Sequence, residues 1–430
     1  MNKLFTKFKL GPITLRNRFI RSAAFENMCT SNTPSQMLED YHVSVAKGGV
    51  GMTTVAYCAV DLSGVSFDGQ LYVREEALPG LKKLTDAVHA EGAMASIQLG
   101  HCGNMTHIAT CHCLPVSAST GFNLYSPTIH RRLKVSEIHD LVKKFGEAVD
   151  FCREAGFDCV EIHAGHAYLI SQFISPRTNH RHDQYGGSFE NRVRFLNEIL
   201  DEVMEHAKAD KKAGKRALAV VVKTNMTDDC WRGSDMKEGI RIAKEIAKHK
   251  VHGIILSAGT VSASPMTILS GAMPIKALAH YMPGKMWWLK AALLCGGGKM
   301  MIPTQKFCEL YLMDWAKQFQ KAFAEDPEVK DTTLIYVGGV QSGVNCQQIM
   351  DEGFELFQLA HVLIKDPEFV HHVEEDIHYH ARCGRSNYCI GRMYTLEMKC
   401  HECVERDGEV IPKSLKKEID QLERRWDAKH

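Results

Sequence analysis

Three side chains capable of hydrogen bonding and proton transfer lie within residues 163–168: His163, His166 and Tyr168. They directly follow a mostly apolar run, 157–162, that is typical of a buried strand. Two imidazoles at this spacing could donate hydrogen bonds to one substrate oxygen, and a phenol beside them could pass a proton. Three ordinary polar residues in a loop would give the same short pattern, so its weight depends on the rest of the chain.

Other chemically useful groups close other apolar runs. Lys223 ends a run of valines, where a lysine is costly to bury without an anion beside it. Gly338 and Gly339 end a later run, and paired glycines let backbone N–H groups close on a phosphate. Each signal also has a plain structural interpretation: a lysine that reaches solvent at a rim, or a common turn.

The elements that must position these residues are visible as eight short, nearly continuous apolar runs, as expected for strands buried on both faces. Amphipathic stretches follow several of them, including 235–248 and 136–155, which Ser136 could cap and Gly156 would end. This alternation predicts an α/β fold, a (β/α)8 TIM barrel. The runs are 19–24, 51–57, 93–99, 157–163, 218–224, 253–257, 334–338 and 356–360.

A doubly wound sheet is the alternative architecture, but no G-x-G-x-x-G follows the first run, which counts against a dinucleotide-binding Rossmann domain. In a barrel, residues just past the strand ends share one face, and that face holds the active site. The residues expected to become neighbours there are Gln98, His163, Lys223, Gly338 and His361.

The stretch 160–195 resembles the Old Yellow Enzyme group of FMN-dependent oxidoreductases, including the barrel domain of 2,4-dienoyl-CoA reductases. That group carries H-x-x-H/N-x-Y after its fourth barrel strand, and then S-P-x-x-N-x-R-x-D-x-Y-G-G-S-x-E-N-R. The resemblance extends over roughly residues 4–369, with a poor match near 260–330. The residues that carry the second part here are Ser175, Pro176, Asn179, Arg181, Asp183, Tyr185, Gly186, Gly187, Ser188, Glu190, Asn191 and Arg192.

The resemblance implies FMN as the bound cofactor, NAD(P)H as the reductant and a small-molecule substrate. It implies that Gln98, which carries a donor and an acceptor, pairs with the amide edge of the flavin. Lys223 would lie near flavin N1, where a cation favours the reduced anion. The phosphate is expected beside the seventh and eighth strands. The implied cofactor-binding residues are Ser22, Ala23, Ala24, Ala56, Gln98, Lys223, Gly338, Gly339, Ala360 and His361.

The chain departs from the family pattern at several positions. Asn104 and His361 stand where the family has arginine, and a histidine is only partly charged at neutral pH. Ser386 replaces the second cysteine of the C-x-x-C-N spacing that some relatives use for an iron–sulfur cluster. Because serine is a poor ligand for such a cluster, we expect no bound metal. A four-sulfur or zinc arrangement that includes Cys400 and Cys403 is the alternative.

Composition limits the function classes. The formal net charge is +1, which gives no support for nucleic-acid binding. The N-terminus lacks an apolar stretch of signal-peptide length, and no 18-residue apolar run indicates a membrane span. The 15 cysteines are too scattered for a small disulfide scaffold, so a cytoplasmic enzyme with reduced thiols is expected. The sequence is compatible with a homo-oligomer and does not fix its size.

The predicted organisation is a barrel over residues 1–375 and a cysteine-containing extension over 376–430. An insertion at 260–332, between the sixth and seventh strands, is long enough to act as a lid. It contains Trp287 and Trp288, which are either core anchors or a wall over the substrate. The glycines at 296–298 indicate a hinge more than a phosphate loop. The charged helix expected at 414–426 is interpreted as solvated.

The resemblance implies that NAD(P)H reduces the C=C bond of an α,β-unsaturated carbonyl compound through FMN. Reductant and substrate would use the site in turn, which gives ping-pong kinetics. His163 and His166 would hold the carbonyl oxygen, and Tyr168 would supply the proton. Flavin-dependent demethylation or nitro reduction on the same fold, and a flavin-binding protein without turnover, are the alternatives.

Overall fold

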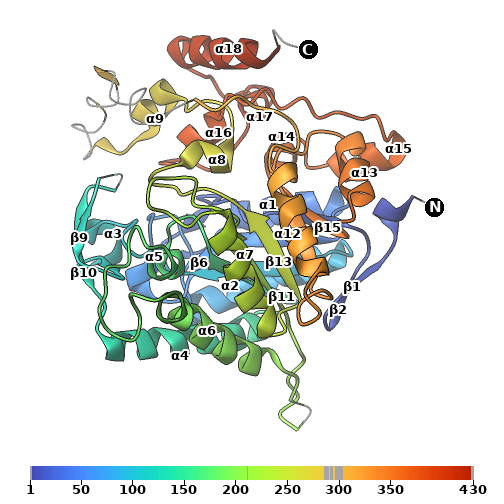
Figure 1. Ribbon diagram of the computed structural model, residues 1–430. Coiled ribbons are helices and arrows are strands. Elements are labelled where there is room, and N and C mark those ends of the chain that lie inside the picture. The colour runs from blue at the N-terminus through green and yellow to red at the C-terminus, as the bar shows by residue number, and fades with distance from the viewer. Residues whose placement is uncertain are drawn as a thin grey trace.

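The computed structural model describes residues 2–124, 126–210, 212–284, 290, 294–295 and 304–427. Eight parallel strands close into a barrel in the order β11-β12-β13-β14-β15-β3-β6-β7, and helices lie around its outside (Figure 1). The predicted (β/α)8 barrel is therefore confirmed, and the doubly wound alternative is wrong.

Each predicted apolar run overlaps one barrel strand. Every residue of the strands from the second to the sixth, except the first of the third strand, is buried, because helices cover the outside and side chains fill the inside. The strands are β3 (Phe19–Arg21), β6 (Met52–Ala59), β7 (Met94–Gly100), β11 (Cys159–Ala164), β12 (Ala219–Asn225), β13 (Gly253–Ser257), β14 (Leu334–Val337) and β15 (Leu356–Leu359).

The larger helices follow the amphipathic pattern, but one predicted cap is wrong. The fourth helix begins at Val135 with Lys134 as N-cap, because the Glu137 carboxylate accepts the Lys134 N–H at 2.7 Å; Ser136 lies inside the first turn. Gly156 does follow its end, with φ +90°. These helices are α1 (Gln36–Lys47), α2 (Leu78–Ala90), α4 (Val135–Glu154), α6 (Phe189–Ala207), α7 (Met236–Lys248), α12 (Met313–Ala324) and α13 (Gly343–Asp351).

Short elements close the barrel and connect its parts. The hairpin of β1 and β2 packs Leu10 and Leu15 against interior residues such as Ile20 and Ile255. It covers the barrel end opposite the strand C-termini. The short elements are η1 (Lys3–Phe5), β1 (Phe8–Leu10), β2 (Ile13–Leu15), β4 (Cys29–Thr30), β5 (Thr33–Pro34), η2 (Leu62–Gly64), η3 (Glu75–Ala77), α3 (Ile108–Cys111), β8 (Val116–Ser117), β9 (Gly121–Asn123), β10 (Thr128–Arg132), α5 (Leu169–Ile174), α14 (His361–Lys365) and α15 (Phe369–Glu375).

A group of helices from two distant parts of the chain gathers beyond one end of the barrel (Figure 1). They are α8 (Pro265–Leu269) and α9 (Ile275–Tyr281), which follow β13, and α16 (Tyr388–Arg392), α17 (His401–Arg406) and α18 (Lys413–Asp427) near the C-terminus. Ala277 and Tyr281 of α9 share an apolar cluster with Tyr388 of α16. The segment after β13 and the C-terminal extension are therefore packed together.

The interpretation of the C-terminal helix as solvated is correct for its charged face only. Leu415, Ile419 and Leu422 of α18 are buried, and the first two join the apolar cluster of α9 and α16. Their spacing of four and three residues places them on one helical face, which the surrounding charges obscured. The predictions for Trp287, Trp288 and the glycines at 296–298 lie outside the described residues. Within the described chain, no helix has the length and apolar character needed to cross a membrane.

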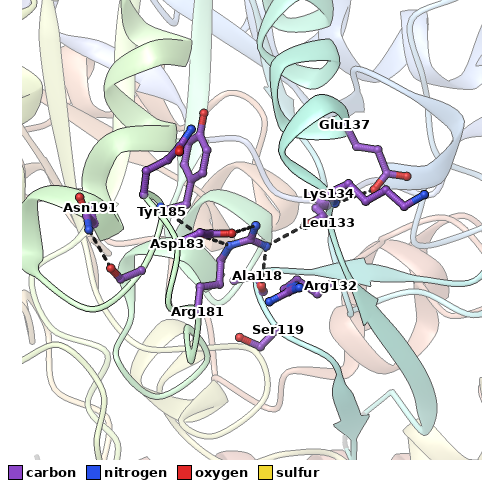
Figure 2. Close-up of polar contacts among 12 residues, drawn as sticks. Ala118, Ser119, Arg132, Leu133, Lys134, Glu137, Arg181, Asp183, Tyr185 and Asn191 are labelled. Carbon is purple, nitrogen blue, oxygen red and sulfur yellow. Dashed lines mark hydrogen bonds and ion pairs between the residues drawn. The ribbon is translucent and has the colours of Figure 1, made fainter.

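The polar motif after α5 joins two loops. The buried Arg181 donates from Nη1 to the carbonyl oxygens of Ala118 (3.0 Å) and Leu133 (2.8 Å). Its Nε and Nη2 atoms contact the Asp183 carboxylate at 2.9 and 2.6 Å (Figure 2). The guanidinium thus fixes the loop before α6 to the strands between β7 and α4. These contacts are structural, because they hold loops together rather than point a reactive group at a ligand.

Replacing Arg181 with alanine should therefore lower the free energy of unfolding. The change removes two carbonyl partners and leaves the Asp183 carboxylate unpaired, at a cost of roughly 3 kcal/mol. Chemical denaturation of Arg181→Ala against wild type measures this difference. Arg132→Ala, at an exposed arginine of the same region (Figure 2), should stay within about 0.5 kcal/mol of wild type. Equal losses in both variants would contradict the structural role of Arg181.

Candidate active site

A cavity of about 1170 Å³ opens at the C-terminal ends of the barrel strands. The barrel gathers side chains there that are far apart in the sequence, as expected for this fold. The predicted site residues that line the cavity are Ser22, Ala23, Ala24, Gln98, His163, His166, Tyr168, Lys223, Gly338, Gly339, Ala360 and His361.

Ala56 is the predicted site residue that does not line this cavity. Its backbone N–H donates to Glu26 Oε1 at 3.1 Å, and its neighbour Tyr57 forms the wall instead. The Tyr57 ring lies 5.1 Å from that of Tyr168 and 5.9 Å from that of His163, between centroids. Sequence reasoning missed Tyr57 because it focused on small residues near a flavin. The role of Ala56 stays a prediction.

His163, His166 and Tyr168 form one compact aromatic group. The His163 ring centroid lies 5.0 Å from that of His166 and 4.8 Å from that of Tyr168. His163 is the last residue but one of β11, and the chain then turns through positive φ values at His166 (58°) and Ala167 (63°). Asn225 Oδ1 accepts the His166 N–H at 3.1 Å, which fixes this turn. Such a turn is what brings two histidines and a tyrosine onto one wall.

Ser257, at the end of β13, positions His166. The Ser257 Oγ atom lies 2.7 Å from His166 Nε2, and both residues line the cavity. The only sequence signal for Ser257 is its place at a strand end. The hydrogen bond assigns one ring nitrogen of His166 to Ser257, which leaves the other for a ligand.

Burial sets the protonation of the three groups. It lowers the pKa of His166 to about 3, aided by the nearby Lys223 charge. Burial also lowers the pKa of His163 well below its ordinary value, with His166 and Lys223 acting in the same direction. The pKa of the Tyr168 phenol is raised, mainly by burial. At neutral pH both imidazoles are uncharged hydrogen-bond donors and Tyr168 keeps its proton.

Glu161, which sequence reasoning missed, is the centre of the polar network at the cavity floor. This fully buried carboxylate contacts Lys223 Nζ at 2.8 Å through Oε1. Its two oxygens also accept the side-chain amides of Gln98 (2.6 Å) and Gln358 (2.8 Å). Glu161 lies two residues before His163 in the same strand, so both side chains face the barrel interior. This alternation was the available signal.

The anion that Lys223 was expected to need is thus present within the protein. Lys223 Nζ also lies 3.2 Å from Ser22 Oγ, which in turn donates to Gln358 Oε1 at 2.9 Å. The network joins residues of five barrel strands or their ends. It holds one cation in the cavity, and a cation there can stabilise negative charge on a ligand.

The two glycines follow β14, which is the third strand from β11 around the barrel, and both line the cavity. Gly339 has φ +75°, and a Cβ on it would lie 2.6 Å from the Leu310 nitrogen, so a larger residue does not fit. The N–H groups of Gly338, Gly339 and Val340 donate to no other described residue. Unpaired backbone donors beside a cavity favour an anionic ligand such as phosphate.

Two departures from the family pattern have structural outcomes. Asn104 is buried and its Oδ1 accepts from Gln172 Nε2 at 3.0 Å, so it supports a loop and does not line the cavity. Cys383, Cys389 and Cys400 line a separate small cavity with Ser386. No group of three or more His, Cys, Asp or Glu side chains in the described chain is arranged to hold a metal ion.

A comparison with known protein families shows the family to which the chain belongs. The sequence model of the NADH:flavin oxidoreductase / NADH oxidase family matches residues 3–267, more than half of the chain. The chain belongs to this family. Membership confirms the resemblance to the Old Yellow Enzyme group and implies FMN and NAD(P)H as cofactors.

Similar proteins agree with this assignment. The 4,4'-dithiodibutanoate disulfide reductase of Rhodococcus erythropolis is 32% identical over 95% of this chain and 96% of its own length. An NADPH dehydrogenase of Bacillus subtilis (strain 168) is 33% identical over 63% of this chain and 77% of its own. The Old Yellow Enzyme homologue from Zymomonas mobilis has the same fold, with a TM-score of 0.67 and 20% identity over 92% of this chain and 97% of that one.

The cavity of this family member fits FMN chemically. One side offers unpaired N–H groups at residues 338–340 for a phosphate, and the floor offers the Lys223 cation for a flavin ring. Small residues, Ala23 and Ala24, line the cavity wall near Ser22, which lets a flat ring approach the backbone. The volume is large enough for a cofactor and a substrate together.

Glu161→Gln should destabilise the protein strongly. The glutamine side chain places an NH2 group among the donors of Lys223, Gln98 and Gln358, which all need an acceptor. It also leaves the Lys223 charge buried without its anion, at a cost of about 3–5 kcal/mol. Chemical denaturation of Glu161→Gln, Lys223→Gln and the double variant forms a thermodynamic cycle. The double variant should lose less than the sum of the single losses. Simple additivity would contradict the paired network.

The lowered pKa of His166 predicts a pH dependence of stability. The unfolded chain binds a proton below about pH 6.5, whereas the folded His166 does so only near pH 3. The cost of keeping the folded His166 unprotonated is absent above about pH 6.5 and grows as the pH falls toward 3. Between pH 6 and 4, the unfolding free energy of wild type should fall more steeply than that of His166→Asn, by about 1.4 kcal/mol per pH unit. Parallel curves would mean that His166 titrates normally.

Proposed function

We propose that the protein uses NAD(P)H to reduce the C=C bond of α,β-unsaturated carbonyl compounds. FMN, when bound, supplies hydride transfer between the nicotinamide and the substrate through its N5 atom. The observation that carries the proposal is the group of His163, His166 and Tyr168 on one wall of the cavity. Reductant and substrate use this cavity in turn, which gives ping-pong kinetics.

The two histidines bind the substrate carbonyl. Both are neutral because burial lowers their pKa values, so each carries one N–H that can donate. Hydrogen bonds from both to one oxygen stabilise the negative charge that develops there when the β-carbon receives hydride. Ser257 holds the His166 ring in the required orientation.

Tyr168 supplies the proton to the α-carbon. Its raised pKa keeps the phenol protonated over the physiological range, so it acts as an acid. Its contact with the His163 ring places the acid beside the groups that hold the carbonyl. The three side chains thus divide the work: two hold the oxygen and one delivers the proton.

The rest of the cavity favours a substrate with an apolar body. Side chains beyond the reactive wall are largely aliphatic or sulfur-containing, and several come from the C-terminal extension. Burial of apolar surface there would bind the substrate, and the polar groups would orient it. Such wall residues include Met105, Leu269, Met273, Ile390 and Met393.

Reduction of an organic disulfide is a second candidate function. The relative that matches almost the whole chain, C-terminal extension included, is a disulfide reductase. In this reaction hydride would add to one sulfur, the S–S bond would break, and the second sulfur would leave as a thiolate. Tyr168 would protonate that thiolate, so the products are two thiols.

Tyr168→Phe should separate the two half-reactions. Reduction of the bound flavin by NADPH or NADH should stay within about threefold of wild type, because no substrate proton is involved. Alkene reduction should slow by roughly 10²- to 10⁴-fold, because the proton donor is lost. Stopped-flow absorbance measures each half-reaction separately with an enone as oxidant.

Tyr57→Phe is the matched control, because Tyr57 is a second phenol in the same cavity. It should leave both half-reactions near wild type. A loss in Tyr57→Phe but not in Tyr168→Phe would assign the proton to Tyr57. Equal slowing of both half-reactions in Tyr168→Phe would contradict the proton-donor role. The same assay with an aliphatic disulfide in place of the enone tests the second candidate.

A further inference from the structure

Arg385, in the C-terminal extension, is a buried cation that lines the cavity and has no carboxylate partner among the described residues. Its side chain lines the cavity, and the residue is only 3% exposed. Nη1 donates to His361 Nδ1 at 2.9 Å, and the guanidinium carbon lies 4.3 Å from the centre of the Phe307 ring. Nε has no hydrogen-bond partner, and no carboxylate of the described residues forms an ion pair with Arg385.

His361 contributes neither a negative charge that would balance Arg385 nor a positive charge of its own. Burial, and then the Arg385 guanidinium, lower the pKa of His361 to about 3, so the imidazole is neutral. Because arginine only donates, His361 Nδ1 must be the acceptor. Among the described residues, the arginine therefore has a hydrogen-bond partner but no opposite charge. A buried charge without a counterion is costly, which indicates that an anionic ligand belongs beside it.

The surroundings specify which anion. Arg385, Gly338 and Gly339 line the same cavity, and the N–H groups of residues 338–340 donate to no described residue. A guanidinium and several unpaired backbone N–H groups that line one cavity match a phosphate, which carries several acceptor oxygens. This is also the end of the barrel, at the loops after the seventh and eighth strands, where such barrels bind phosphate.

We propose that Arg385, contributed by the C-terminal extension, binds the phosphate of FMN and supplies the positive charge that the neutral His361 at the eighth strand does not. The proposal rests on the proposed function in one respect, that FMN is the bound cofactor. His361 has a positioning role, because it accepts from Nη1 and thereby orients the guanidinium.

Hydrogen bonds fix the chain both before and after Arg385. Cys383 N donates to Gln341 Oε1 at 2.8 Å, and Gln341 Nε2 donates to the Cys383 carbonyl at 3.0 Å. After Arg385, Asn387 Nδ2 donates to the carbonyl oxygens of Ser270 (2.9 Å) and Ala272 (3.0 Å). The extension is thus fixed to the loop after β14 and to the segment after β13. These contacts hold the Arg385 backbone in place at the cavity.

Flavin titration of the whole 430-residue chain, freed of bound flavin, tests the proposal. FMN and riboflavin share the ring system, but only FMN has the phosphate. In Arg385→Ala the Kd for FMN should rise about 100-fold, which is typical for loss of a buried charge-assisted contact. The Kd for riboflavin should stay within about threefold of wild type. Quenching of flavin fluorescence measures both without any turnover.

Arg382→Ala is the matched control, because Arg382 is an exposed arginine of the same segment. It should leave both dissociation constants unchanged. Thermal unfolding and circular dichroism show whether each variant is folded. If Arg385→Ala does not fold, Arg385→Lys and Arg385→Met carry the test, because they differ in charge but keep a long side chain. The lysine variant should retain part of the preference for FMN over riboflavin, and the methionine variant should lose it.

Two results would overturn the proposal while leaving the cofactor assignment intact. One is an unchanged FMN affinity in Arg385→Ala, and the other is an equal loss for FMN and riboflavin in a folded variant. Failure of the wild-type protein to bind either flavin is a different outcome, because it removes the cofactor from the proposed function and this proposal with it.

Discussion

The cavity depends on one buried ion pair, Glu161 with Lys223. Both side chains are nearly inaccessible to solvent, so the pair is stable only because amides and a hydroxyl complete its hydrogen bonding. Those groups come from different strands, and the pair therefore fixes the barrel interior at the level where a ligand meets it. It also keeps a positive charge next to His163 and His166, which helps to hold both imidazoles neutral.

The sequence predicted the eight strands because strands buried on both faces must be apolar throughout, whatever their neighbours are. It predicted the cavity residues at strand ends because the barrel alone determines that these ends meet. The sequence did not reveal residues whose role depends on contacts between distant parts of the chain. Glu161 is a single acid inside an apolar run, Ser257 is an ordinary serine, and Arg385 is one arginine among many. The buried face of α18 was missed because its three apolar residues are surrounded by charge.

The C-terminal extension contributes directly to the cavity, although the family model ends at residue 267. Ile390 and Met393 line the wall, and Arg385 lines the same cavity as Gly338 and Gly339. The barrel thus supplies the reactive wall, and the part of the chain after the matched region supplies much of the remaining surface. Differences in substrate among relatives are expected to arise there, since apolar walls can change without altering the groups that hold a carbonyl.

An absorbance spectrum of the purified protein before and after anaerobic NAD(P)H tests directly whether the cavity holds FMN and passes its hydride to an alkene. We expect flavin bands that bleach on reduction and return when an enone is added, because one cavity serves reductant and acceptor in turn. A colourless protein that does not take up added FMN would contradict the cofactor assignment. Bands that bleach but do not return with any enone would contradict alkene reduction.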